Sequence, residues 1–210
     1  YCLRYLPSAQ KLKSFLEQGR IGTLYNAHIE VGQYLPDWRP NKNYLDSVSA
    51  QKILGGGVLF ELSHELDYAQ WLLGPLHVKY SILRSSEELA LDVEDAADII
   101  ALTESGAVTT IHLDFLQRKA HRKCSFIGSG GRVDLDLILN KLTLSTSTGM
   151  SVLYTDSKWD KNQMYLAMLE DFVQMIEKKT HTCIDLTEAI RTVSIIDEIK
   201  EQASNNRYNK

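Results

Sequence analysis

Groups that can transfer protons are densest in one short stretch, which reads ELSHELDY from Glu61 to Tyr68. His64 and Asp67 are three residues apart, so on a helix they share one face, and Glu61 falls one turn earlier on the same side. A carboxylate beside an imidazole orients the ring and tunes its pKa, which is what a general base working near neutral pH requires. The pattern indicates an acid/base site centred on His64. The simpler alternative is a solvated polar face of the helix.

The same stretch does not fit a metal site. In a zinc-hydrolase motif a second histidine follows the first by four residues, and that position is Tyr68. The three cysteines, Cys2, Cys124 and Cys183, lie far apart without a CxxC pair, which is typical of reduced thiols in a cytosolic protein. We therefore expect no bound metal, and a metal-dependent hydrolase is the most remote of the candidate functions.

A polar, proline-containing stretch precedes this region. Residues 34–49 read YLPDWRPNKNYLDSVS, and the two prolines prevent the stretch from continuing a central strand. Loops of about sixteen residues inside compact domains are usually functional or disordered. We expect Tyr34, Trp38 and Arg39 to contact a substrate, because a tryptophan–arginine pair can stack on and hydrogen-bond a sugar or a carboxylate. The equal alternative is that the pair holds its own loop in place.

Two glycine clusters raise the question of a phosphate-binding loop. Residues 55–57 are three glycines ahead of a helix, and a helix N-terminus can receive an anion. No strand feeds this helix in a βαβ unit, however, and the GxGxxG spacing is absent. The second cluster, residues 128–131, leads into a strand and is typical of a hairpin turn. We therefore expect no cofactor-binding residues for a dinucleotide within this chain.

Apolar periodicity predicts the elements that must position these groups. Helical spacing indicates helices from Pro7 to Gly19 and over residues 58–73, 160–178 and 186–203, with Ser8 as an N-cap of the first and Asp185 or Thr187 capping the last. Period-two alternation indicates strands over residues 22–31, 78–83, 97–103, 107–116, 123–127, 133–137 and 142–145. Short turns join consecutive strands, and the helices cluster before and after them. The pattern predicts an α+β fold, an open and mainly antiparallel β-sheet with helices on one face.

The strand over residues 107–115 indicates that the other face of the sheet is open. Its odd positions are apolar or threonine, while its even positions include His112 and Asp114. The strand over residues 22–31 places His28 and Glu30 on its polar face in the same way. Because an open sheet face of this size often becomes an interface between subunits, we expect a homo-oligomer that associates through it.

Composition excludes several classes of protein. The 210 residues fit one large domain or two small ones, and 44% hydrophobic with 24% charged residues is typical of a soluble globular chain. No apolar run approaches the roughly 20 residues that a membrane span needs. The net charge is -4 and no cluster of lysines or arginines tracks one face, so nucleic acid is not an expected partner. The chain opens on Tyr1 without a basic-then-apolar leader, which favours a cytoplasmic protein and a fragment of a longer one.

Three stretches resemble the C-terminal domain of the Gfo/Idh/MocA oxidoreductase family. They read YCLRYLPSAQKLKSFLEQGRIGTLYNAHIEVGQYLPDWRP from Tyr1, GGGVLFELSHELDYAQWLLG from Gly55 and FIGSGGRVDLD from Phe126. The resemblance runs in order over nearly the whole chain. Within the family, the chain looks most similar to members that act on sugars in surface-polysaccharide pathways. It implies a Rossmann domain that binds NAD or NADP and a lysine-bearing segment, both before Tyr1. It also implies an open-sheet domain that contacts substrate and carries the oligomer interface.

The resemblance also assigns residues by position. His64 matches the acid/base histidine of the family, Asp67 the substrate-contacting aspartate after it, and Arg4 an arginine of the LRF-type segment. Glu61 stands in for an aspartate that lies four residues before the histidine in the family, one residue further away than here.

The resemblance implies that residues 1–210 are the single substrate-binding and oligomerisation domain of an NAD(P)-dependent oxidoreductase. The expected substrate is the hydroxyl of a sugar, a nucleotide sugar or a cyclitol, and this chain alone is expected to be inactive. The alternative is a non-catalytic sugar-binding or assembly module derived from the same family.

Overall fold

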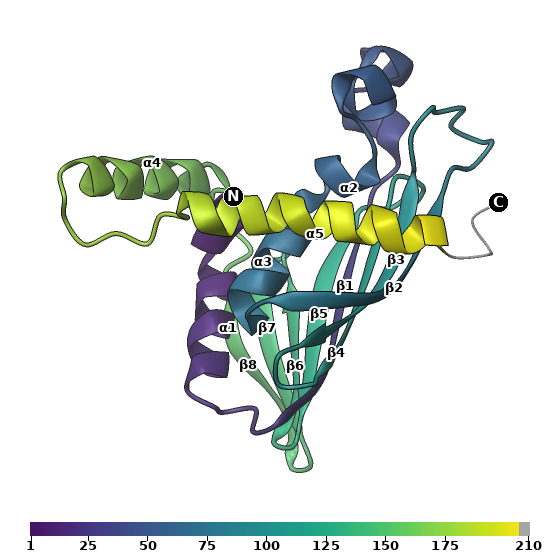
Figure 1. Cartoon of the computed structure of the whole chain (residues 1–210). Helices are drawn as coiled ribbons and strands as arrows, with labels where there is room; N and C mark the ends of the chain where they lie inside the picture. The colour runs from purple at the N-terminus through teal and green to yellow at the C-terminus, as the bar shows by residue number, and fades with distance from the viewer. Residues whose placement is uncertain (206–210) are drawn as a thin grey trace.

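The computed structural model describes residues 1–205, and its centre is one eight-stranded sheet in the order β2-β3-β4-β1-β5-β6-β7-β8 (Figure 1). Every pair of neighbouring strands is antiparallel except β1 and β4, which run parallel. The strands are β1 Leu24–Gly32, β2 Leu76–Arg84, β3 Ala96–Thr103, β4 Val108–Asp114, β5 His121–Gly128, β6 Gly131–Asp136, β7 Lys141–Thr146 and β8 Gly149–Thr155. The predicted open, mainly antiparallel sheet is confirmed.

Five α-helices accompany the sheet: α1 Pro7–Glu17, α2 Val58–Glu61, α3 Ser63–Leu73, α4 Asn162–Ile176 and α5 Leu186–Asn205. Short 3-10 helices fill the remaining turns: η1 Cys2–Tyr5, η2 Leu35–Trp38, η3 Tyr44–Asp46, η4 Val48–Ala50 and η5 Lys52–Leu54. In Figure 1, α3 and α5 lie across one face of the sheet with α1 beside them, while α4 projects to the side. α1 packs over β6 to β8, α3 over β1 and α5 over β2. The predicted placement of the helices on one face is therefore confirmed.

The helix ends agree with one of the predicted N-caps and disagree with another. Asp185 caps α5, because its Oδ1 accepts a hydrogen bond of 2.7 Å from the backbone N–H of Glu188. The prediction that Ser8 caps the first helix is wrong. Leu6 is the N-cap and Pro7 takes the first helical position, which suits proline because its missing N–H would be unpaired there. Ser8 is buried instead, and its N–H donates to Asn140 Oδ1.

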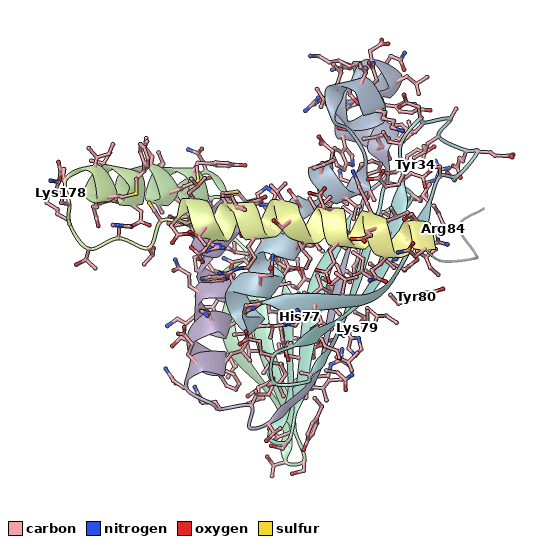
Figure 2. The ribbon with its side chains drawn as sticks, in the orientation of Figure 1. Tyr34, His77, Lys79, Tyr80, Arg84 and Lys178 are labelled. Atoms are coloured by element: carbon pink, nitrogen blue, oxygen red, sulfur yellow. The ribbon has the colours of Figure 1, made fainter. Side chains whose placement is uncertain are left out.

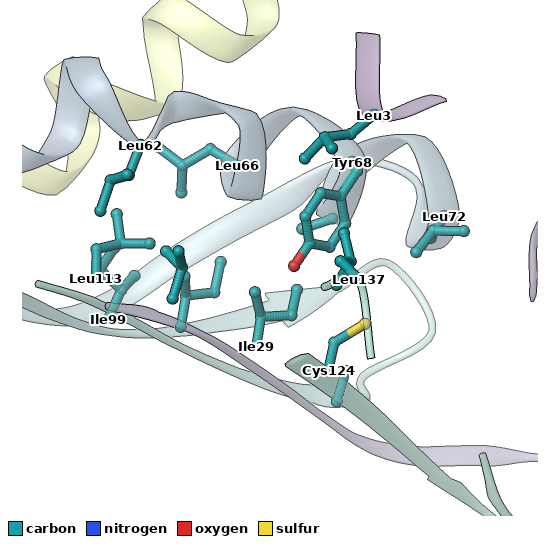
Figure 3. Close-up of a cluster of buried hydrophobic side chains, with 14 of the residues drawn as sticks. Leu3, Ile29, Leu62, Leu66, Tyr68, Leu72, Ile99, Leu113, Cys124 and Leu137 are labelled. Atoms are coloured by element: carbon teal, nitrogen blue, oxygen red, sulfur yellow. The ribbon is translucent and has the colours of Figure 1, made fainter. Parts of the chain in front are cut away.

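The core lies between α3 and the middle of the sheet. Figure 3 shows Leu62, Leu66 and Leu72 pointing from the helical layer toward Ile29, Ile99 and Leu113 on the strands. Leu66 and Leu113 have no exposed surface, and the other four are at most 7% exposed. Burying one such side chain completely stabilises the fold by about 1.5 to 3 kcal/mol. This cluster therefore fixes α3, which carries the candidate acid/base residue, against the sheet.

The sequence analysis did not predict one of the strands, β8. β8 is an edge strand whose residues are exposed or half-buried, so it shows no buried face that would produce a period-two apolar pattern. Among residues 1–205, no helix is both long and apolar enough to cross a bilayer.

Candidate functional site

The chain around His64 forms two helices and not the single helix that the apolar spacing predicted. α2 ends at Glu61 and α3 begins at Ser63, because Leu62 has φ -105° and ψ 25°, away from α-helical values. Glu61 therefore does not lie one turn before His64 on a common helical face, and that prediction is wrong. Its side chain is half-buried at the end of α2.

α3 is enclosed, so its polar side chains do not form a solvated surface. Glu65 has no exposed surface, Asp67 is 1% exposed and Tyr68 is 2% exposed. The alternative of a solvated polar face is therefore wrong. Charged groups are almost never fully buried unless they are paired, so each of these carboxylates requires a partner from elsewhere in the fold.

Asp67 finds its partner in Arg4, which was predicted to bind substrate as well. Arg4 Nε donates to Asp67 Oδ2 at 2.9 Å, and Arg4 Nη2 donates to Asp67 Oδ1 at 2.8 Å, which is a bidentate geometry. The third donor, Nη1, reaches Glu188 Oε1 on α5 at 3.1 Å. This buried pair joins η1, α3 and α5 at one point. Both oxygens of Asp67 are thus committed to Arg4, and neither orients the imidazole of His64.

Glu65 forms a second buried ion pair, which sequence reasoning did not anticipate. Its two carboxylate oxygens accept hydrogen bonds of 2.6 and 2.9 Å from Nε and Nη2 of Arg122 on β5. The partners are 57 residues apart in sequence, and only the packing of α3 over the sheet brings them together. No local pattern marked Glu65 out for this pair, because α3 also carries Ser63, His64, Asp67 and Gln70.

His64 lies near Arg122 and Tyr1 in an environment that holds it neutral. The ring of Tyr1 meets the imidazole edge-on at 5.2 Å between centroids, and His64 Nδ1 is buried without a hydrogen-bond partner in the described part of the chain. Burial and, after it, the nearby Arg122 guanidinium lower the pKa of His64 to about 4. At neutral pH the imidazole is therefore uncharged, the form that can accept a proton.

The loop over residues 34–49 folds into η2, η3 and η4 and encloses a hollow of about 430 Å³. Trp38 and Arg39 line it, as do Tyr44 and Lys42. Trp38 is also held by its own loop, because its Nε1 donates to the carbonyl oxygen of Gln33 at 3.1 Å and its ring meets Phe115 edge-on at 5.4 Å. The tryptophan therefore does help to hold its own loop in place, while its contact with a substrate stays a prediction.

Tyr34 does not line this hollow. The guanidinium of Arg118 lies 3.7 Å from the centroid of its ring, and its hydroxyl donates to Glu88 at 3.4 Å. Figure 2 shows Tyr34 in the upper part of the molecule. The structure therefore separates Tyr34 from Trp38 and Arg39, with which it was grouped.

A third predicted group, His64, lines neither that hollow nor the smaller one of about 360 Å³ between η1 and the ends of β1 and β5. The smaller hollow does include Arg122, together with Gln33, His121 and Lys161. Arg122 thus connects the surroundings of His64 to solvent-accessible space.

The glycine loop before α2 does not provide a phosphate cradle. The backbone N–H groups of Gly55, Gly56 and Gly57 donate to carbonyl oxygens of the preceding 3-10 turns, and that of Val58 donates to Glu94 O. These amides are therefore not available to an anion. Residues 128–131 form the hairpin between β5 and β6, as predicted. Neither loop fits a dinucleotide. The residues of this chain that fit a role in a cofactor-dependent reaction are therefore those predicted to contact the substrate. Among residues 1–205, no cluster of three or more metal-ligating side chains is present.

The open face of the sheet carries a polar network beside a hollow of about 990 Å³. His112 Nδ1 contacts Asp98 at 2.6 Å and its Nε2 contacts Asp114 at 2.9 Å, while His28 hydrogen-bonds Thr110 at 2.7 Å. The bonds from Asp114 and Asp98 raise the pKa of His112 to about 9 despite partial burial. Figure 2 shows Tyr80 and Arg84 of β2 on the side of the molecule away from α4. The predicted polar, open face is confirmed.

Residues 9–134 match the family model described as GFO/IDH/MocA C-terminal domain. No curated protein sequence matches the chain significantly.

Solved structures share its fold. Levoglucosan dehydrogenase in complex with NADH and levoglucosan superposes with a TM-score of 0.84 at 19% identity, over 97% of this chain and 63% of that chain. An oxidoreductase from Agrobacterium radiobacter in complex with NAD+, L-tartaric acid and magnesium gives 0.78 at 17% identity, over 97% and 61%. The WlbA dehydrogenase from Bordetella pertussis, in complex with NADH and UDP-GlcNAcA, gives 0.74 at 16% identity, over 96% and 60%. At these identities the likeness establishes the fold alone, and the chain spans about three fifths of each of these structures.

Proposed function

Since the chain belongs to the Gfo/Idh/MocA oxidoreductase family, as its C-terminal domain, we propose that it is the substrate-binding and oligomerisation domain of an NAD(P)-dependent dehydrogenase. The proposed substrate is the hydroxyl of a sugar, a nucleotide sugar or a cyclitol. A Rossmann domain and a lysine-bearing segment precede Tyr1 in this proposal. NAD or NADP, when bound there, supplies the hydride acceptor. The names of the similar structures, which include NADH complexes with levoglucosan and with UDP-GlcNAcA, support this choice.

The observation that carries the proposal is the state of His64. A base that removes a hydroxyl proton must be uncharged at the working pH. His64 meets this condition because its pKa is lowered to about 4, although Asp67, which is engaged by Arg4, does not orient its ring. We assign His64 as the group that accepts the hydroxyl proton.

The other predicted residues take different roles in this proposal. Arg4 and Asp67 act as positioning residues, because their ion pair fixes η1 against α3 and so fixes Tyr1 beside His64. Trp38 and Arg39 contact the sugar from the loop hollow, since one offers an apolar ring face and the other a fork of donors for hydroxyl or carboxylate oxygens. Contacts of Glu61 and Tyr34 with substrate remain predictions.

Replacing His64 in the full-length enzyme tests the proposal. His64→Gln keeps the approximate size and hydrogen bonding of the side chain but removes proton transfer, so turnover should fall by about 10²- to 10⁴-fold. Binding of NADH should barely change, since the other domain holds the dinucleotide. His77→Gln is the matched control, because His77 is exposed on β2. Turnover of His64→Gln within a few-fold of the wild-type enzyme would make His64 a structural residue.

That outcome would favour the second candidate, a non-catalytic sugar-binding or assembly module of the same family. Two observations support it: Glu61 lies on a separate helix from His64, and His64 does not line the loop hollow. Sugar binding without turnover, measured by calorimetry on the full-length protein with NAD and NADP present, would establish it.

We also propose that the open sheet face mediates self-association. The polar network around His112 and the adjoining hollow provide a surface of charged and hydrogen-bonding groups. Sedimentation at micromolar concentration should therefore detect a dimer or tetramer. A strict monomer would count against this assignment.

A further inference from the structure

One face of α4 exposes a continuous apolar stripe. It consists of Tyr165, Leu166, Leu169, Phe172, Val173 and Ile176, which are 44% to 63% exposed. The spacing is i, i+1, i+4, i+7, i+8 and i+11, so the six side chains line one side of the helix. We call this surface the α4 stripe. Contiguous apolar patches larger than a few hundred Å² are rare on monomeric proteins and mark interaction sites.

The opposite side of α4 is already occupied by this chain. Met164 is buried, Met168 packs against the core, and Asp171 Oδ2 accepts a hydrogen bond of 2.7 Å from the hydroxyl of Tyr5 in η1. α4 therefore carries apolar side chains both on the side that packs against this chain and on the exposed stripe. A polar side with exposed Gln163 and Glu170 separates the two.

The start of α5 also exposes apolar side chains. Leu186, Ile190 and Val193 are 51% to 76% exposed and lie at i, i+4 and i+7. Further along α5 the apolar side chains turn inward, and Ile195, Ile196 and Ile199 are at most 4% exposed. On these two helices the large exposed apolar side chains therefore lie on α4, which projects away from the sheet, and on the first turns of α5 (Figure 1).

The location of the stripe points to its occupant. Figure 1 places the N-terminus where α4 meets the start of α5, and η1, which follows Tyr1 directly, packs against α4. Any domain that precedes Tyr1 therefore enters the molecule beside this surface. The superposition with levoglucosan dehydrogenase covers 97% of this chain but only 63% of that protein. A large part of that structure therefore has no counterpart in residues 1–210.

Two other occupants fit the surface less well. Helices that lie on membranes carry lysines and arginines on their polar face, whereas α4 contains neither and its charged residues are Glu170 and Asp171. A second copy of this chain has a separate candidate surface in the open sheet face.

We propose that the α4 stripe and the first turns of α5 form the docking surface for the dinucleotide-binding domain that precedes Tyr1. This inference rests on the proposed function, and it adds the surface through which the two domains are held together. Docking there covers the apolar side chains and places the preceding domain next to Tyr1 and His64.

Photo-cross-linking in the full-length protein tests the contact directly. Leu169 is replaced by p-benzoylphenylalanine, and the cross-linked peptides are identified by mass spectrometry. The expected product is an intramolecular link from position 169 to a peptide that precedes Tyr1. The matched control places the same group at Ala167, which is exposed on the polar side of α4 away from the stripe and should not give that product. An intermolecular link between two copies, or no link to the preceding segment, would overturn the proposal.

Charge substitutions on the α4 stripe test whether the contact between the two domains is needed for turnover. In the full-length protein, Leu169→Glu with Phe172→Glu should lower turnover more than tenfold and leave the Kd for NADH within about threefold. The control pair Gln163→Glu with Ala167→Glu adds the same charge to the other side of the helix and should leave both unchanged. Wild-type turnover in the Leu169 and Phe172 variant would overturn the proposal. A full-length protein that shows the intramolecular link but binds no NADH would refute the proposed function and leave the docking surface standing.

Discussion

Breaking the buried ion pair between Arg4 and Asp67 should destabilise this domain strongly, because one buried charge then loses its partner. Asp67→Asn removes the charge of a side chain that is 1% exposed and keeps its shape. Arg4, whose side chain is 9% exposed, then retains only the bond to Glu188, a carboxylate that is 34% exposed. Removing one partner of a buried pair costs about 3 to 5 kcal/mol, and because Glu188 still compensates part of the charge we expect about 3 kcal/mol.

Urea and thermal unfolding measure this loss. For a chain of this size 1 kcal/mol corresponds to roughly 2 to 4 °C, so the melting temperature of Asp67→Asn should fall by roughly 6 to 12 °C. The matched control is Asp134→Asn, which breaks a 2.7 Å pair with Arg132, whose side chain is 54% exposed. Exposed pairs contribute about 0 to 1 kcal/mol, so the control should change little.

A double replacement tests the reasoning further. Arg4→Met with Asp67→Leu removes both charges and fills the site with apolar groups, which should recover much of the stability that Asp67→Asn loses, because no unpaired buried charge remains. A cost below about 1 kcal/mol for Asp67→Asn would refute the argument that the pair is buried and mutually dependent.

Three further predictions concern protonation and cofactor binding. The pKa of His64 is lowered to about 4 in the fold from an ordinary value of about 6.5, so its neutral form contributes stability above pH 6.5 that is lost as pH falls through 4. In urea titrations at different pH values, His64→Gln should remove about 3 kcal/mol of this acid-dependent loss in the free energy of unfolding. The pH–rate profile of the full-length enzyme should have its histidine limb near pH 4 rather than near neutrality. The pKa of His112 is raised to about 9, so its charged form contributes stability below pH 6.5 that is lost as pH rises through 9. His112→Gln should flatten this alkaline loss, which we set at about 1 to 2 kcal/mol because the ring is partly exposed and solvent screens its carboxylate partners. The isolated chain should not bind NADH or NADPH in calorimetry, because the amides of its glycine loop are bonded within the fold, and micromolar binding would contradict this.

Much of the fold could be read from local patterns. β1 and β4 alternate buried and open positions because each has one face on the core and one on the open side, and that arrangement imposes a period of two on the sequence. Gly106 has φ +85° in the turn between β3 and β4, a conformation that glycine adopts without strain, so this short turn between consecutive strands is marked by its residue type. These features depend on neighbouring residues and on which side is buried.

Other features were not local and could not be read in this way. The break between α2 and α3 at Leu62 interrupts an apolar spacing that would fit one helix, and the backbone N–H of Val58 is held by Glu94 O from another part of the chain. β1 pairs in parallel with β4, although the two strands are separated in sequence by α2, α3 and two other strands. A spacing pattern records which side of an element is apolar, but not which element packs against it.

The candidate site likewise has features that the sequence determines and features that depend on the tertiary structure. The sequence by itself determined that His64 and Asp67 share a helix, and its resemblance to the family predicts an acid/base residue at His64. Only the tertiary structure decided their environments, because Arg4, Tyr1 and Arg122 reach α3 from η1 and β5. Helical spacing sets the direction in which a side chain leaves its helix, whereas its ionisation depends on burial and on charges brought close by distant segments of the chain. His64 is therefore neutral because of long-range packing, and the residues around it in the sequence do not contain that information.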